Sequence, residues 1–373
     1  MKKQRSRMQQ TVTIRDVAKR AGVSPMTVSR VINNGSNVTD ATRTVVMSAI
    51  QDLNYAPNPS ARRLAGHESL RIGLLYSNPS AAFLSELLIG VLGESSKTGH
   101  QLMIEKCGAN AASERAALRK LLDGGATGLI LPPPLCETRS VLAEMQQAGI
   151  AIVSVAAGNT SADFATVRMD NYKAAWEMTA YLLSLGHRDI GFIKGHPNQT
   201  VSEQRLQGFL DALKVAGVDP SGVGVEQGYF SYRSGATAAE LLLSRRPRPT
   251  AIFAANDDMA AATLATAHRL GIEVPGDLSI AGFDDTPIAA TLWPTLTTVR
   301  QPIAAMARTA VQLLLKEMRR QRDKNPRPPS QQLLRHVLVK RGSTGPVPTT
   351  ARSGRDRGSS RSARSPVLDE SRG

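Results

Sequence analysis

The sequence predicts a two-part protein, with an N-terminal all-α helix-turn-helix head followed by an α/β core of two lobes. The head is predicted because residues 11–56 carry helix caps and apolar positions at helical spacing. The core is predicted because, from Arg71 onward, short apolar runs alternate with longer amphipathic stretches. Such alternation is typical of parallel sheets with helices on both faces. A core of about 250 residues exceeds one comfortable doubly wound sheet, so we expect two lobes.

The first predicted helix covers residues 14–21 and has a clear beginning and end. Thr13 and Asp16 have the spacing of a capping box, which satisfies backbone donors at the start of a helix. Gly22 follows the helix and supplies the backbone freedom of a tight turn. The apolar side of this helix consists of Ile14, Val17 and Ala18.

The second predicted helix, residues 25–33, is the one that a helix-turn-helix places in the major groove of DNA. Ser24 can cap it, and Pro25 suits the first helical position, where a missing N–H costs nothing. If Val28, Val31 and Ile32 are buried, the outward residues are Pro25, Met26, Thr27, Ser29 and Arg30. Arg30 is the strongest base-reading candidate, because its guanidinium fork matches O6 and N7 of guanine. The alternative is a generic three-helix cluster with a solvated arginine.

A third helix and a short fourth one complete the head. Thr39 can cap the third, whose buried stripe we expect to be Val45, Val46, Ile50 and Leu53. In the next segment, Asn58 can cap a helix of about seven residues that Gly66 ends. A helix of that length is not stable alone.

The core is predicted to contain strands at residues 71–76, 101–105, 128–131, 150–155, 190–194, 225–230, 250–255 and 278–283. We place the change from the first lobe to the second near residues 156–161. The chain is expected to cross back near residues 283–292 and again before Arg319. Residues 343–373, rich in Ser, Arg, Gly, Pro and Thr, are expected to form a disordered basic tail.

Charge is unevenly distributed along the 373 residues, whose net charge is +15. Residues 1–66 carry eleven Lys or Arg against three Asp or Glu, and residues 319–373 carry fourteen against four. The middle holds 21 basic and 24 acidic side chains. A head with a net charge of +8 is what a polyanion partner such as DNA attracts. For the tail we favour the simpler interpretation, solubility.

Enzyme chemistry finds little support in the sequence. No Gly-x-Gly-x-x-Gly follows a predicted strand, and residues 93–98 lack the second glycine of a phosphate loop. The six histidines are scattered without metal-ligand spacing, and His187 is more simply structural. Asp257 and Asp258 are better explained as favourable charges at a helix start than as an acid–base pair. We therefore expect no catalytic residue, no metal and no cofactor.

The sequence also indicates where the protein works. Cys107 and Cys136 are the only cysteines, without the spacing of a disulfide framework or a metal motif. No run of about 18 apolar residues is present, and no apolar segment follows the basic start. We expect a cytoplasmic protein.

Ten segments, in order along residues 11–342, resemble the lactose/galactose repressor (LacI/GalR) family of transcription regulators. Those of the head are residues 13–18 (TIRDVA), 21–24 (AGVS), 27–33 (TVSRVIN), 53–58 (LNYAPN) and 61–65 (ARRLA). Those of the core are residues 185–193 (LGHRDIGFI), 205–209 (RLQGF), 255–260 (ANDDMA), 282–285 (GFDD) and 296–302 (LTTVRQP). Chance does not explain such an ordered set.

The resemblance implies a homodimer, or a tetramer, that binds a near-palindromic double-stranded DNA operator. Its hinge helices would lie in the minor groove, where Leu64 matches a leucine that wedges into the central base step. A marginal hinge helix can fold on DNA and melt when the lobes shift, which couples effector state to affinity. Beyond the outward residues of the second helix, the implied DNA contacts are Thr13, Asn37, Tyr55, Asn58, Ala61, Leu64 and Ala65. Pro25 and Met26 stand where relatives often carry polar readers, which leaves the outer operator bases open.

For the core, the resemblance implies a periplasmic-binding-protein-like fold with an effector, most simply a sugar, between the lobes. Arg205, Asn256 and Asp284 match ligand-contacting positions and together supply the donors and acceptors that a polyol needs. Weaker candidates for the cleft are Ser77, Asn78, Phe83, Asp170 and Phe253. Trp293 would either stack on a sugar or pack between the lobes. Each of these residues has a plain structural alternative, such as a helix cap or a core position.

The expected domains are therefore a DNA-binding head (11–56), a hinge (57–70), an effector-binding and dimerisation core (71–342) and the tail (343–373). The expected function is regulation of transcription, by repression in the first instance. Activation is an alternative that nothing in the chain decides. A solute-binding protein of a transport system is disfavoured by the basic head and the missing signal peptide.

Overall fold

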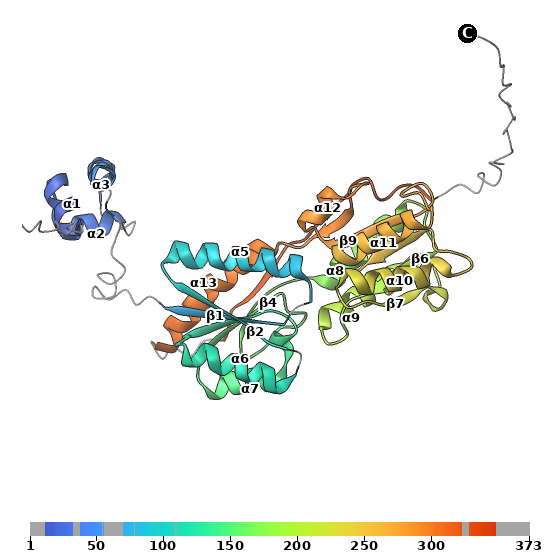
Figure 1. The fold of residues 1–373 in the computed structure, drawn as a ribbon, viewed down its shortest axis with the longest axis horizontal. Helices are drawn as coiled ribbons and strands as arrows, with labels where there is room; N and C mark the ends of the chain where they lie inside the picture. The colour runs from blue at the N-terminus through green and yellow to red at the C-terminus, as the bar shows by residue number, and fades with distance from the viewer. Residues whose placement is uncertain are drawn as a thin grey trace, which may run out of the picture. The chain divides into compact units, whose positions relative to one another are not determined.

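The computed structural model describes residues 12–32, 38–53, 55, 70–77, 79–108, 110–322 and 328–347 (Figure 1). The chain divides into two compact units, Met1–Leu70 and Arg71–Gly373. Among the described residues, no helix has the length and apolar character needed to cross a membrane. The hinge expected at residues 57–70 lies outside the described residues except for Leu70.

The head contains three helices, α1 (Ile14–Ala21), α2 (Pro25–Ile32) and α3 (Asp40–Asp52), which confirms the predicted order. The Asp16 carboxylate accepts from the backbone N–H of Thr13 at 2.8 Å and from its hydroxyl at 2.6 Å. Gly22 takes a left-handed φ of +66° in the turn between α1 and α2. The Ser24 hydroxyl oxygen accepts from the backbone N–H of Thr27 at 3.1 Å. Local side-chain chemistry therefore sets these helix boundaries.

One apolar cluster joins the three helices, formed by Val17, Ala18, Ala21, Val28, Val31, Val46 and Ala49. The predicted stripe of α3 is partly wrong. Val45 is half exposed, whereas Ala49 lies in the cluster, and Ile50 and Leu53 are only partly buried. The buried face of α3 is rotated by about one residue from the predicted face. Val46 and Ala49, three residues apart and therefore on one side of the helix, point into the cluster.

The first lobe is an all-parallel six-stranded sheet in the order β11-β5-β4-β3-β1-β2. Its strands are β1 (Arg71–Tyr76), β2 (Gln101–Lys106), β3 (Gly128–Leu131), β4 (Ala151–Val155), β5 (Ala165–Met169) and β11 (Gln331–Leu334). Helices α5 (Ala81–Thr98) and α13 (Ile303–Arg322) cover one face, and α6 (Ala111–Asp123) and α7 (Arg139–Gln147) cover the other (Figure 1).

The second lobe has a six-stranded sheet in the order β12-β10-β9-β8-β6-β7, with only the β10–β12 pair antiparallel. Its strands are β6 (Ile190–Lys194), β7 (Val225–Gln227), β8 (Ala251–Ala254), β9 (Ser279–Asp284), β10 (Thr297–Arg300) and β12 (Val337–Val339). Its helices are α8 (Asn171–Ser184), α9 (Thr200–Val215), α10 (Tyr232–Ser244), α11 (Asp257–Arg269) and α12 (Pro287–Thr291). Two short 3₁₀ turns, η1 (Leu135–Glu137) and η2 (Pro220–Gly222), lie in the first and second lobes.

All eight predicted strands are present, with ends shifted by up to three residues, but β5, β10, β11 and β12 were not predicted. The positions of the lobe changes were therefore wrong. The chain leaves the first lobe after β5 rather than at residues 156–161, and returns between β10 and α13 rather than at 283–292. Its last crossing lies between β11 and β12, after Arg319. β5, β10 and β11 are short and contain Thr, Gln or Arg, and β12 has only three residues, so no long apolar run marks any of these strands.

The start of the predicted tail belongs to the core, which is a second correction. Ser343 is fully buried, and its hydroxyl donates to the Ile280 carbonyl at 2.6 Å. The backbone N–H of Val347 donates to the Leu185 carbonyl at 2.9 Å. His187 is fully buried and lies 3.0 Å from the Gly345 carbonyl, which supports its structural interpretation. The core therefore extends at least to Val347, and residues 348–373 lie outside the described residues.

Candidate functional site

The outer face of α2 is presented as the sequence predicts. Pro25, Met26 and Arg30 are exposed, Met26 by 64%. Thr27 and Ser29 are half-buried, and the Thr27 hydroxyl lies 2.9 Å from that of Ser24. Because Val28 and Val31 point into the head, the opposite face of α2 presents the exposed side chains of Pro25, Met26 and Arg30.

The other expected DNA contacts are less uniformly placed. Thr13 is exposed, and its hydroxyl donates to Asp16, which lowers the pKa of that carboxyl. Tyr55 is half-buried and packs against the apolar cluster of the head. The remaining predicted contacts, Asn37, Asn58, Ala61, Leu64 and Ala65, lie outside the described residues.

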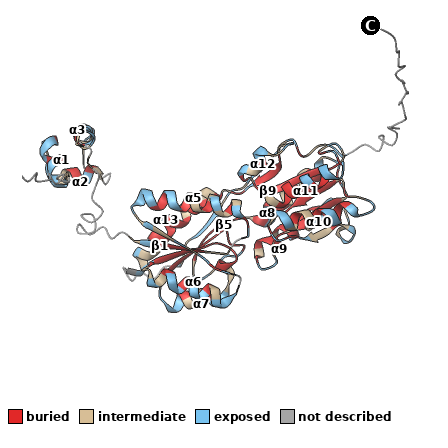
Figure 2. Cartoon of the chain, viewed as in Figure 1, coloured by how far each residue is buried: buried red, intermediate tan, exposed pale blue. Residues whose placement is uncertain are grey.

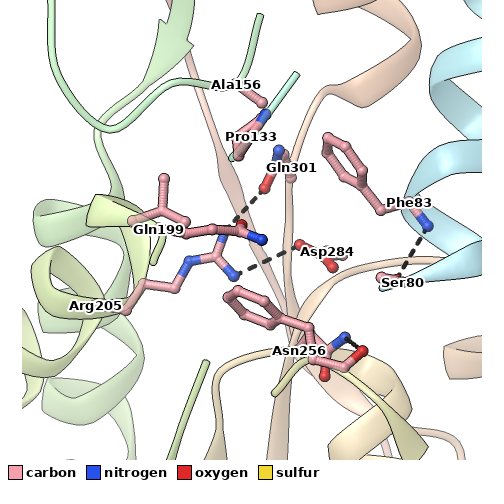
Figure 3. A pocket seen from close by; sticks show the side chains of 11 residues that line it. Ser80, Phe83, Pro133, Ala156, Gln199, Arg205, Asn256, Asp284 and Gln301 are labelled. Carbon is pink, nitrogen blue, oxygen red and sulfur yellow. Dashed lines mark hydrogen bonds and ion pairs between the residues drawn. The ribbon is translucent and has the colours of Figure 1, made fainter. Parts of the chain in front are cut away.

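A pocket lies between the two lobes of the core (Figure 3). Its empty space, counted together with the open mouth, is about 330 Å³. The first lobe contributes Ser80, Phe83, Pro133 and Ala156, and the second contributes Gln199, Val201, Arg205, Phe230, Asn256, Asp284 and Gln301. Most of these residues follow the carboxyl ends of strands, where open α/β sheets bind ligands.

Arg205 is the most heavily engaged side chain of the pocket. It is 4% exposed, and its Nε donates to Asn171 Oδ1 at 3.0 Å. One terminal nitrogen donates to the Ala255 carbonyl at 2.5 Å, and the other to Gln301 Oε1 at 3.1 Å. The guanidinium lies 3.6 Å from the centre of the Phe283 ring, on which it stacks. These contacts hold the cation rigidly.

Asp284 faces Arg205 across the pocket, with 3.8 Å between a carboxylate oxygen and a guanidinium nitrogen. At that distance the two form an ion pair rather than a close hydrogen bond. Burial lowers the pKa of Arg205 to about 10 and raises the pKa of Asp284 well above its ordinary value, while the attraction between them opposes both shifts. A ligand that donates to Asp284 would stabilise its charged form.

Asn256 lines the pocket, but both polar atoms of its amide are already engaged. Its Oδ1 accepts from the backbone N–H of Met259 at 3.0 Å, which caps α11. Its Nδ2 donates to the Phe230 carbonyl at 3.1 Å. Next in the chain, Asp257 is fully buried, and burial raises the pKa of its carboxyl to about 7.

Two groups of polar contacts join the lobes beside the pocket. Ser80, at the start of α5, donates to the Asp258 carboxylate at 3.0 Å. Glu137 accepts from the backbone N–H groups of Gly158 and Thr200, each at 2.9 Å, and from the Thr200 hydroxyl. Because Glu137 belongs to the first lobe and Thr200 begins α9 of the second, this carboxylate fastens the lobes together.

Of the nine expected effector-binding residues, the pocket brings together Phe83, Arg205, Asn256 and Asp284. Asp170 caps α8 by accepting from the backbone N–H of Lys173, and Phe253 is buried in the core against Phe192. Trp293 is 86% exposed and does not pack between the lobes. Neither these three residues nor Ser77 line the pocket, and Asn78 lies outside the described residues.

Sequence reasoning missed Ser80, Pro133, Ala156, Gln199, Val201, Phe230 and Gln301. Gln301 falls in the quoted segment 296–302, so its position was a usable signal. Gln199 belongs to no recognised motif, yet it is 4% exposed and its Nε2 has no hydrogen-bond partner among the described residues. In Figure 3 its side chain lies beside the Arg205 guanidinium. A buried, unpaired donor of this kind indicates a missing acceptor.

Two family models match this chain, one described as bacterial regulatory proteins of the lacI family, over residues 13–58. The other, a periplasmic binding protein-like domain, matches residues 179–344. The transcriptional repressor PurR of Salmonella paratyphi B is 36% identical over 319 residues, which cover 84% of this chain and 92% of that protein.

Solved structures are similar over the same extent. A complex of the transcriptional regulator CelR with cellobiose has 29% sequence identity and a TM-score of 0.68, and the match covers 89% of this chain and 99% of that one. The lac repressor dimer bound to operator and the anti-inducer ONPF has 28% identity and a TM-score of 0.67, with 90% and 100% covered.

Proposed function

Because this chain belongs to the LacI family of bacterial regulatory proteins, we propose that it represses transcription under the control of a small molecule held between its lobes. It is a DNA-binding transcriptional regulator with an effector-binding core. The observation that supports control by a ligand is the buried Arg205–Asp284 pair, which faces an interlobe pocket instead of filling it. We assign it no catalytic step and place its action in the cytoplasm, where its DNA would lie.

We propose that α2 enters the major groove and reads bases with Pro25, Met26, Thr27, Ser29 and Arg30. Thr13, Asn37 and Tyr55 would contact the adjoining backbone. Asn58, Ala61, Leu64 and Ala65 would form the minor-groove hinge contact. The basic head supports this arrangement through the release of counterions from the DNA.

We propose a sugar-like effector, anchored by Arg205 and Asp284 and flanked by Phe83 and Phe230. The hydroxyl groups of a sugar can both donate and accept hydrogen bonds. They could donate to the Asp284 carboxylate and accept from Gln199 Nε2, which has no partner among the described residues. Aromatic rings on the lining suit the apolar faces of a sugar ring. Among the similar structures, CelR holds cellobiose, and a LacI family regulator of Enterococcus faecium at 26% identity holds ribose.

The function is tested by selecting DNA from a random pool with the purified protein at a stated salt concentration. We expect enrichment of one near-palindromic sequence, and a gel shift on it that changes when the effector is added. Cellobiose and ribose are the first probes, followed by sugar phosphates and purines, in a thermal-shift screen. Binding that never exceeds that of random duplex would refute the proposal.

Gln199 provides a prediction that needs no effector. A buried, unsatisfied donor costs about 1–3 kcal/mol, so Gln199→Leu is expected to raise the melting temperature of the ligand-free protein by roughly 2–12 °C. The same change should reduce the melting shift that the effector produces. Gln147→Leu, at an exposed position of α7, is the matched control and should leave both values unchanged. An unchanged or lower melting temperature for Gln199→Leu would count against a role for this donor.

We further propose a homodimer that uses the outer face of α5. Figure 2 shows exposed residues, in pale blue, along α5. Ile89 and Leu92 on this helix are 66% and 55% exposed, and Gly93 beside them has open space in front of it. The small residues Ser85 and Ser96 share the face at helical spacing. A second copy is the simplest occupant, because a near-palindromic operator needs two heads.

Ile89→Asp is expected to weaken self-association at least tenfold, because it would desolvate a charge in an apolar interface. Sedimentation velocity across a range of concentrations measures this change. Val215→Asp, at a 77% exposed position of α9, is the control and should remain associated like the wild type. Equal association of the two variants would place the interface elsewhere.

A further inference from the structure

Strained backbone gathers around the interlobe pocket. Among the described residues, four that are not glycine have a left-handed φ: Ala156 at 56°, Phe230 at 57°, Asp284 at 108° and Asp285 at 57°. The first three line the pocket, and Asp285 follows the third. Residues with a Cβ seldom adopt this conformation, so the surrounding structure must hold each of them in place.

Phe230 is held by Asn256. The Asn256 Nδ2 donates to the Phe230 carbonyl at 3.1 Å, while its Oδ1 accepts from Met259 at the start of α11. The helix thus fixes the orientation of the amide, and the amide fixes the carbonyl of a left-handed residue. Asn256 is 1% exposed, and each polar atom of its amide makes one hydrogen bond that fixes the orientation of the side chain.

Asp257, the residue after Asn256, holds Thr286, which directly follows Asp284 and Asp285. One oxygen of its carboxylate accepts from the backbone N–H of Thr286 at 2.8 Å and from the Thr286 hydroxyl at 3.1 Å. The other accepts from the Thr298 hydroxyl at 2.6 Å, on β10. Thr286 directly follows the left-handed pair, so the carboxylate ties the end of the strained segment to the neighbouring strand.

The space around Asp257 is built for this contact. A Cβ added at Gly282 would lie 2.5 Å from the nearer Asp257 oxygen, so a side chain there would displace the carboxylate. Two consecutive residues at one helix start therefore hold two segments far apart in the sequence. Those segments place the Phe230 ring and the Asp284 carboxylate beside Arg205, at 5.7 Å from the ring centre and at 3.8 Å respectively.

We propose that Asn256 and Asp257 are positioning residues, which hold Phe230 and Asp284 in left-handed conformations facing the effector. This inference rests on the proposed effector site. It adds a positioning role to the ligand contact expected of Asn256, and it gives Asp257 a role that sequence reasoning did not assign. The start of α11 would thus hold both of these segments, which line the pocket on the side of the second lobe.

Two variants each remove hydrogen bonding by one of these residues, Asn256 to Phe230 or Asp257 to Thr286, and retain the rest of the residue's chemistry. Asn256→Ser keeps a good helix cap but loses the donor to Phe230. Asp257→Asn keeps the shape but replaces one acceptor oxygen with a donor. The matched control for Asn256→Ser is Asn110→Ser, because Asn110 also caps a helix, α6. The matched control for Asp257→Asn is Asp219→Asn, because the Asp219 carboxylate also accepts from a backbone N–H and a hydroxyl, both of Ser221. In the described part of the chain, neither control residue forms a hydrogen bond with a residue of left-handed φ.

Hydrogen exchange of the ligand-free full chain, followed by mass spectrometry, reads out each segment separately. We expect at least tenfold faster exchange in residues 228–231 for Asn256→Ser, and in residues 284–287 for Asp257→Asn. Each variant should leave the other segment and α11 protected. The controls should change neither segment, and Gly282→Ala should reproduce the Asp257→Asn pattern.

Three outcomes would overturn the proposal. Unchanged exchange in both segments would show that Asn256 and Asp257 hold neither segment. Faster exchange throughout the second lobe would show a general role in stability. Unchanged exchange in Asn256→Ser, together with a lost thermal shift from whichever probe shifts the wild type, would show direct ligand contact. If the wild type selected no operator, the proposed function would be refuted. The exchange pattern would still show whether Asn256 and Asp257 hold the two segments.

Discussion

Arg205→Ala is expected to destabilise the core by about 3–5 kcal/mol and to abolish the response to effector. The change leaves Asp284 buried without its counter-ion, and it frees the acceptors on Asn171, Ala255 and Gln301 that the guanidinium satisfies. Equilibrium unfolding in urea measures the loss of stability. Effector-induced change in operator affinity is then measured at a temperature where the variant is folded.

The matched control for this prediction is Arg269→Ala. Arg269 also forms an ion pair, with Glu240 at 2.5 Å, but both side chains are more than half exposed. Exposed pairs contribute about 0–1 kcal/mol, so this variant should unfold close to the wild type. If Arg205→Ala proved as stable as Arg269→Ala, the buried network would not have the importance assigned to it. If effector still changed the operator affinity of Arg205→Ala, with wild-type affinity for the effector itself, Arg205 would not belong to the effector site.

Arg30→Ala is expected to lose about 1–3 kcal/mol of specific operator binding while the head stays folded. Arg30 is exposed on α2, and its neighbours Val28 and Val31 form part of the apolar cluster, so truncation removes the proposed base contact and leaves the cluster intact. The measurement is a gel shift on the selected operator and on random duplex at one salt concentration. The ratio of the two affinities should fall, because a base contact carries sequence information whereas a phosphate contact does not.

The result also tests the orientation of α2. If the ratio were unchanged, the face that carries Pro25, Met26 and Arg30 would not be the one that meets base edges. Met26 strengthens this test, since an exposed thioether at the front of the helix suits the methyl group of thymine better than a hydrogen-bonding base edge. Met26→Gln should therefore shift the selected sequence at the outer operator positions.

Local chemistry explains why the head could be predicted so closely. Thr13 with Asp16, Gly22, and Ser24 before Pro25 act within one helical turn, so their spacing in the sequence already contains the geometry that the structure shows. The apolar strands of both lobes follow the same logic, because a buried parallel strand needs a continuous apolar run. Where strands are short and polar, as in β5 and β10, burial depends on neighbours distant in the chain, and the prediction failed.

The sequence by itself determined the class of the protein, the boundaries of its head helices and four residues that line the interlobe pocket, Phe83, Arg205, Asn256 and Asp284. Tertiary structure alone decided which other side chains surround them and which groups lack a partner. Gln199 is distinctive only because its amide nitrogen is buried without a partner among the described residues, and Asn256 because its amide bonds the Phe230 carbonyl and the Met259 N–H. Helix caps depend on contacts three or four residues apart, whereas the pocket is assembled from strand ends of two lobes that only the folded chain brings together.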